Sequence, residues 1–102
     1  MHMIQLLLPL WSNDGERLPH ALFEQVRDEL TGRYGGLTAY ARTPASGLWR
    51  QQGGETVHDD IVVYEVMADG LDVEWWVSYR TELEKRFRQD QLVVRAHKIR
   101  VL

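Results

Sequence analysis

Hydrophobic residues along the chain fall into six segments, and their spacing predicts the order strand, helix, strand, strand, helix, strand. The strands are expected at about 3–10, 37–42, 61–67 and 92–101, where apolar and β-branched residues gather between turn residues. Residues 48–51 are expected to resume extended structure, and the glycine pair at 53–54 to turn the chain back. Segment 61–67 gives the strongest strand signal, because it is dense in Ile, Val and Tyr.

The first helix is expected between the turn residues at 11–15 and the glycine pair at 35–36. Leu22, Val26 and Leu30 recur every four residues, so they form one stripe that should be buried. Pro19 suits the first turn, where its missing N–H costs no hydrogen bond. The pair Gly35 and Gly36 should end the helix, because glycine readily adopts the left-handed backbone conformation of a helix C-cap.

The second helix is expected from Asp72, a favourable N-cap, to about Arg88. One of its faces should be buried, and it carries Val73, Trp76, Leu83 and Phe87. Trp75 and Tyr79 lie four residues apart on a neighbouring face, where they are predicted to stack on each other.

This order of elements predicts a ferredoxin-like βαββαβ fold of the α+β class. Each strand–helix–strand unit should cross over with right-handed connectivity, and the two units should interleave into one antiparallel sheet of spatial order 4-1-3-2. Both helices then lie on the same side of the sheet. The chain has 102 residues, so we expect one domain that covers residues 1–102.

Side chains alternate between the two faces of a strand, so each predicted strand divides into two sets. The set expected under the helices is almost wholly apolar: Ile4, Leu6, Leu8, Leu10, Leu37, Ala39, Ala41, Val62, Tyr64, Val66, Leu92, Val94 and Ala96. The opposite set, called the open face below, is Met3, Gln5, Leu7, Thr38, Tyr40, Arg42, Ile61, Val63, Glu65, Met67, Val93, Arg95, His97 and Ile99. A fully solvated face would be more uniformly polar than this one.

The apolar members of the open face predict an interface. Leu7, Ile61, Val63, Met67, Val93 and Ile99 would form an exposed apolar patch, and such patches usually mark contact surfaces. The natural partner is the same face of a second copy, which gives a two-fold homodimer with two packed sheets. A charged substitution in the patch, such as Val63→Glu, is then expected to separate the copies. Trp49 is either an anchor for the second copy or a packing residue within one chain.

The polar members of the open face, Gln5, Tyr40, Arg42, Glu65, Arg95 and His97, allow two hypotheses. In the first, Glu65 pairs with Arg42 or Arg95 and fixes strand register or dimer alignment. In the second, the set lines a cavity in which His97 is an acid or base and the arginines hold an anionic or oxygenated small molecule. His97, Arg95, Tyr40, Glu65 and Arg42 are therefore the candidate catalytic residues of a small enzyme, and the residues leave both hypotheses open.

Composition and local motifs remove several other functions from consideration. A net charge of −3 argues against nonspecific binding to nucleic acid, and the absence of cysteine excludes disulfides and thiolate chemistry. Segment 3–10 is too short to span a membrane, so we expect a cytoplasmic protein without a membrane partner. Residues 58–60 are His, Asp and Asp, but adjacent ligands make a poor metal site, and Ser12 and Ser46 lack the context of a nucleophile. We expect neither a metal nor a cofactor.

Three stretches, 35–40, 47–49 and 60–67, resemble a family of short bacterial proteins of this fold. The order of elements and the two-sided sheet resemble the dimeric α+β barrel group, which includes antibiotic-biosynthesis monooxygenases and muconolactone-isomerase-like enzymes. The resemblance covers nearly the whole chain as a pattern, and no catalytic residue of that group matches a position here. It implies a homodimeric barrel that serves as a structural or small-ligand-binding module. The alternative that it implies is a cofactor-independent enzyme acting on a small oxygenated metabolite.

Overall fold

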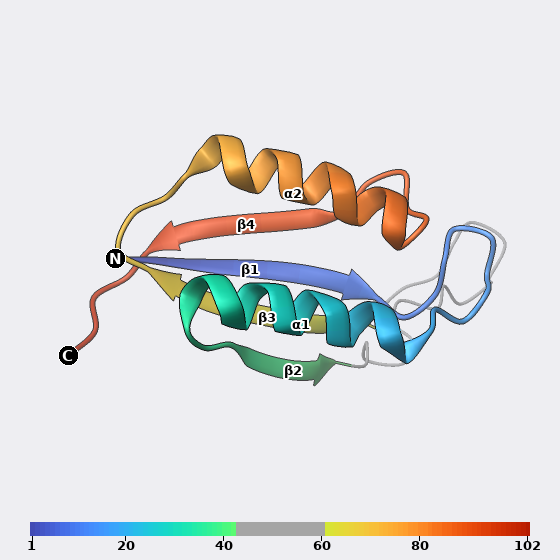
Figure 1. Ribbon diagram of the computed structural model, residues 1–102, viewed down its shortest axis with the longest axis horizontal. Helices are drawn as coiled ribbons and strands as arrows, with labels where there is room; N and C mark the ends of the chain where they lie inside the picture. The colour runs from blue at the N-terminus through green and yellow to red at the C-terminus, as the bar shows by residue number, and fades with distance from the viewer. Residues whose placement is uncertain (43–60) are drawn as a thin grey trace, which may run out of the picture.

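The computed structural model describes residues 1–42 and 61–102, and it confirms the predicted fold (Figure 1). The elements are β1 (His2–Pro9), α1 (His20–Tyr34), β2 (Thr38–Arg42), β3 (Ile61–Ala68), α2 (Val73–Arg86) and β4 (Val93–Lys98). The strands form one sheet of order β2-β3-β1-β4, in which each neighbouring pair is antiparallel. This is the predicted order 4-1-3-2, read from the opposite edge.

The core lies between the sheet and both helices, on the face that the sequence assigned to them. Ile4, Leu6 and Leu8 of β1 are at most 1% exposed and pack in one cluster with residues of both helices. The helices contribute Phe23, Val26, Leu30, Trp76, Tyr79, Leu83 and, at the end of α2, Phe87. Phe23 and Phe87 meet edge to face with ring centroids 5.1 Å apart, which joins the two helices over the sheet.

Two helix ends follow the predicted capping chemistry, whereas Pro19 lies at the N-cap of α1, just before the first turn in which it was expected. Gly35 ends α1 at a φ of 79°, and its N–H donates to the Thr31 carbonyl at 2.7 Å. Asp72 caps α2 by accepting a hydrogen bond from the Trp75 N–H at 3.1 Å. The turn after β1 uses Gly15 at a φ of 81°, a conformation that glycine adopts without strain.

Several predicted boundaries and burials were wrong. Helix α2 ends at Arg86 because Arg88 takes a left-handed φ of 50°, which a continuing helix cannot accommodate. Val73 is 58% exposed, because it occupies the first position of α2, at the end of the core stripe. Strand β4 ends at Lys98, so Ile99 lies beyond the open face, with its N–H bonded to the Met1 carbonyl.

Ala39 and Ala96 lie on the helix-covered face as predicted, yet both are exposed. They belong to β2 and β4, the two edge strands, and their small side chains reach little of the core cluster. The extended segment predicted at 48–51, the turn at 53–54, Ser46, Trp49 and the residues at 58–60 lie outside the described residues.

Candidate functional site

The open face is organised in rows that run across the strands. The register places Thr38, Glu65, Gln5 and Arg95 side by side in one row that crosses β2, β3, β1 and β4 in turn. The next row is Tyr40, Val63, Leu7 and Val93, and the row on the other side holds Met67, Met3 and His97. A polar row thus lies between two mainly apolar ones, an arrangement that strand alternation alone does not reveal.

Hydrogen bonds connect the members of the polar row. The Arg95 Nε donates to the Gln5 Oε1 at 2.8 Å, and the Gln5 Nε2 donates in turn to the Glu65 Oε2. Gln5 therefore stands between the two charged residues, whereas the sequence suggested that Glu65 would pair directly with Arg42 or Arg95. Arg42 pairs with Ile61 at the end of β2, and its side chain lies outside the described part of the structure.

Tyr40 extends this network from the neighbouring row. The negative charge of Glu65, together with a hydrogen bond between the two side chains, raises the pKa of Tyr40 above its ordinary value of 10.0. The phenol therefore stays protonated at neutral pH and serves as a donor, not as a general base. Its side chain remains about half exposed.

His97 lies apart from this network. It faces Met3 in the neighbouring row and is exposed, two residues along β4 from Arg95. The structure thus joins Tyr40 to Glu65 directly and Glu65 to Arg95 through Gln5, while His97 sits one row away. Tyr40 also borders a wide cavity of about 790 Å³ with His20 of α1, but His97 is not among its lining residues.

Apolar side chains on both sides of the polar row remain accessible. Met67 and Val93 are each 51% exposed, and Tyr40 has the same exposure. Val63, by contrast, is only 7% exposed, although it lies outside the core cluster on the open face. Substitution of Val63 would therefore disturb the single chain, and Val93 is the better position at which to test association.

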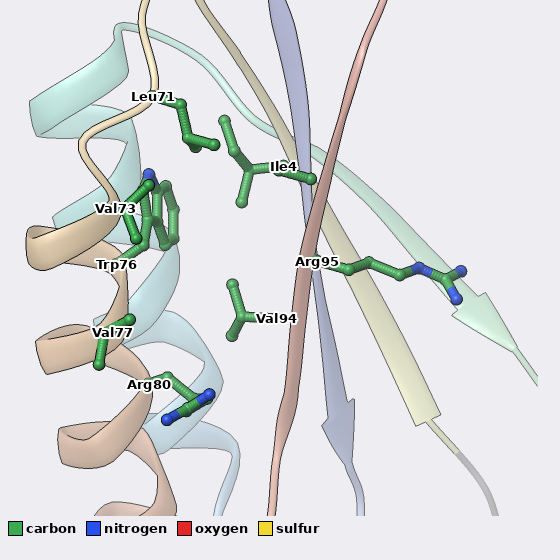
Figure 2. A pocket seen from close by; sticks show the side chains of 9 residues that line it. Ile4, Leu71, Val73, Trp76, Val77, Arg80, Val94 and Arg95 are labelled. Atoms are coloured by element: carbon green, nitrogen blue, oxygen red, sulfur yellow. The ribbon is translucent and has the colours of Figure 1, made fainter.

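A second site, which the sequence did not indicate, lies on the helix-covered side between α2 and the β4 edge (Figure 2). This pocket has a volume of about 140 Å³ and is lined by Ile4, Leu71, Val73, Trp76, Val77, Arg80, Val94, Arg95 and Ala96. The side chain of Arg95 extends away from it, toward the open face, as Figure 2 shows. Trp76 is buried as predicted, at 5% exposed, and it forms a wall of this pocket.

The side of α2 toward α1 carries an aromatic and charged cluster that extends from the core to the surface and links the two helices. Trp75 and Tyr79 stack as predicted, with ring centroids 4.8 Å apart and an interplanar angle of 16°. The Arg33 guanidinium lies 4.0 Å from the centre of the Trp75 ring, in a cation–π arrangement. We assign this cluster a structural role, because its groups are engaged with one another.

The chain matches no family model and no curated protein. It is similar to a solved structure of a phage SAM lyase in complex with S-methyl-5'-thioadenosine, with a TM-score of 0.58 and 16% sequence identity. The match covers 95% of this chain and 80% of that chain. At this identity the similarity concerns the ferredoxin-like α+β fold alone. In residues 1–42 and 61–102, no helix is long and apolar enough to cross a membrane, and no three His, Asp or Glu side chains gather as metal ligands.

Proposed function

We propose that this protein is a homodimeric small-ligand-binding module whose two copies associate through their open faces. The observation that carries the proposal is the pair of apolar rows on a sheet face that neither helix covers (Figure 1). Accessible apolar side chains such as Val93 and Met67 favour a partner over water, because burying apolar surface is favourable.

The size of the face supports a dimer. Four strands about 4.8 Å apart, at about 3.3 Å per residue, give a face of roughly 19 by 20 Å. Its projected area is therefore about 400 Å², and the accessible area is larger because the side chains protrude. A stable interface buries about 800 Å² on each partner, so the open face supplies a large share of what is needed.

The hydrogen bonds of the polar row favour a role in aligning the two copies of the dimer. Glu65 and Arg95 would be costly to bury without partners, and Gln5 provides each of them with one. A satisfied polar row between two apolar rows can enter an interface and still specify how the copies are placed. The same bonds occupy Tyr40, Glu65 and Arg95, which the enzyme hypothesis needs for a substrate.

Sedimentation at micromolar concentration tests the dimer. The wild-type chain should sediment at about 24 kDa, twice the 11.9 kDa of one copy. Val93→Lys places a charge in the interface with the same sign as neighbouring Arg95, so it should weaken association roughly a hundredfold or more. Ser78→Lys is the control for the added charge, because Ser78 is exposed on α2, away from the open face. A monomeric wild type, or equal effects of the two substitutions, would contradict the proposal.

Ligand binding is tested on the same proteins by thermal shift. S-Methyl-5'-thioadenosine, which the similar SAM lyase structure contains, is one compound to include. A ligand that stabilises wild type but not Val93→Lys would locate its site at the interface, whereas equal stabilisation of both would locate it within one copy.

A further inference from the structure

The pocket between α2 and β4 has the size and the lining of a site for a single-ring compound. Its volume of about 140 Å³ is close to that of an apolar cavity of about 150 Å³ that takes up benzene. Its walls are mainly aliphatic, with the Trp76 indole on the helix side and Ile4 and Val94 on the sheet side. The pocket therefore favours an apolar ring as the body of a ligand.

Two donors at this pocket have no hydrogen-bond partner within the described residues. They are the Trp76 Nε1–H and the Arg80 Nε–H, and both nitrogen atoms are buried. Buried donors of this kind are rare in folded proteins, because the hydrogen bond to water that each loses is not replaced. Both residues line the pocket, so an acceptor bound there would satisfy the two donors once the side chains that cover these nitrogens shift to admit it.

The charge at the pocket is positive. Arg80 forms no ion pair with a described carboxylate, whereas Arg86, further along α2, binds both Glu29 and Glu82. The nearby Glu84 side chain accepts the Leu92 N–H at 3.0 Å. Arg80 is therefore free to bind an anionic oxygen, and the two oxygens of a carboxylate match the geometry of a guanidinium.

The two donors lie toward different ends of the pocket. Trp76 and Arg80 are one turn apart on α2, and Figure 2 shows the indole nitrogen at the Leu71 end and the guanidinium at the other. We propose that this pocket binds a single-ring hydroxy- or oxo-carboxylate. Arg80 holds its carboxylate, and the Trp76 N–H donates to the oxygen on the opposite side of the ring. The site gives a location to the ligand-binding part of the proposed function, and it does not depend on dimerisation, because it lies on the helix-covered side.

The ¹H–¹⁵N spectrum of the full chain provides a direct test, with 4-hydroxybenzoate as the probe. The indole N–H signal of Trp76, assigned by its loss in Trp76→Phe, should shift saturably at millimolar concentrations of the probe. Benzoate, which lacks the far oxygen, and 4-hydroxybenzamide, which lacks the charge, should each bind roughly tenfold more weakly. The three compounds are compared on the wild-type protein, and Trp76→Phe serves here only to assign the indole signal.

The variants should remove these preferences separately. Arg80→Gln should bind 4-hydroxybenzoate no better than 4-hydroxybenzamide. Trp76→Phe, followed by the backbone amide signals of the pocket because it has no indole signal at position 76, should bind 4-hydroxybenzoate no better than benzoate. Arg27→Gln, an exposed arginine on α1 with the same change in charge, should leave the wild-type preference intact. Saturable binding should persist in Val93→Lys, even if that variant is monomeric.

Two results would overturn the proposal. If the Trp76 signal does not move with any of the three compounds, the pocket does not bind a single-ring hydroxycarboxylate. If it moves equally in Arg80→Gln and wild type, Arg80 does not recognise the carboxylate. Neither result affects the sedimentation test, so failure of this site and failure of the dimer remain distinguishable.

Discussion

The contact between the two helices leads to a prediction about pH-dependent stability. Glu29 of α1 and Arg86 of α2 form a two-pronged ion pair, with nitrogen–oxygen distances of 2.7 and 3.1 Å. The Tyr79 hydroxyl donates to the same carboxylate at 2.8 Å. Glu29→Gln removes the charge while keeping the shape of the side chain, so it isolates the contribution of the ion pair.

The burial of the two side chains determines how much stability Glu29→Gln should remove. The Arg86 side chain is 19% exposed and that of Glu29 is 36%, so the pair lies between the surface and the interior. Exposed pairs contribute about 0.2–1 kcal/mol, and hydrogen bonds to charged groups about 1.5–3 kcal/mol. After reduction for solvent screening, we expect Glu29→Gln to lower the free energy of unfolding by about 1–1.5 kcal/mol. For a domain of this size that corresponds to a fall of about 5 °C or more in Tm.

The sign of the pH dependence follows from the pKa of Glu29. The hydrogen bond from Arg86 lowers this pKa below its ordinary value of 4.5; burial opposes the shift, and the bond from Tyr79 adds to it. A carboxyl whose pKa is lower in the folded state stabilises the fold above its unfolded pKa. This contribution is lost as the pH falls from about 4.5 through the lowered folded value.

Urea unfolding at pH 7 and pH 3, at one fixed protein concentration, measures this effect. The difference in the free energy of unfolding between wild type and Glu29→Gln should be present at pH 7 and largely absent at pH 3. A double-mutant cycle with Arg86→Gln should give a coupling energy of about 1 kcal/mol at pH 7. Glu24→Gln is the control on the same helix, since the Glu24 side chain is 48% exposed and, within residues 1–42 and 61–102, its ion pair is with His20 on α1 itself. A gap of the same size at both pH values, or no coupling to Arg86, would refute the reasoning.

Two further predictions concern the core and a helix end, and both are measured by urea unfolding followed by circular dichroism. Leu6→Ala should lower the free energy of unfolding by about 2–5 kcal/mol, because Leu6 is 0% exposed at the centre of the sheet; a loss below about 1 kcal/mol would mean that the site is not tightly packed. Gly35→Ala should cost about 1–2 kcal/mol from its φ of 79° alone, because nothing lies within 4 Å of the added Cβ. A neutral or stabilising Gly35→Ala would contradict the left-handed C-cap.

Local patterns determined much of what the sequence could predict. The two faces of the sheet follow from the alternation of side chains, which is a property of each strand alone. The caps at Gly35 and Asp72 follow from backbone preference and a hydrogen bond within one turn, so they too could be predicted. The strand order required the additional rule that crossovers are right-handed, and this rule applies to nearly all such folds.

The site residues depended on relationships that no local pattern contains. Gln5 appeared as one polar residue among six on the open face, and only the register of β1 between β3 and β4 placed it as the bridge from Arg95 to Glu65. The register between neighbouring strands is decided by the whole sheet. The sequence alone therefore could not show whether Glu65 pairs directly with an arginine.

The open face itself was therefore determined by the sequence, whereas the contacts on it and the pocket behind it were decided by the tertiary structure. The stripe of α2 predicted that Trp76 would be buried, and it is. That Trp76 and Arg80 both line a pocket beside β4 depends on how α2 sits over the edge of the sheet. A hydrophobic pattern specifies which side of a helix is buried, but the space left between that side and the sheet depends on how all the neighbouring side chains pack together.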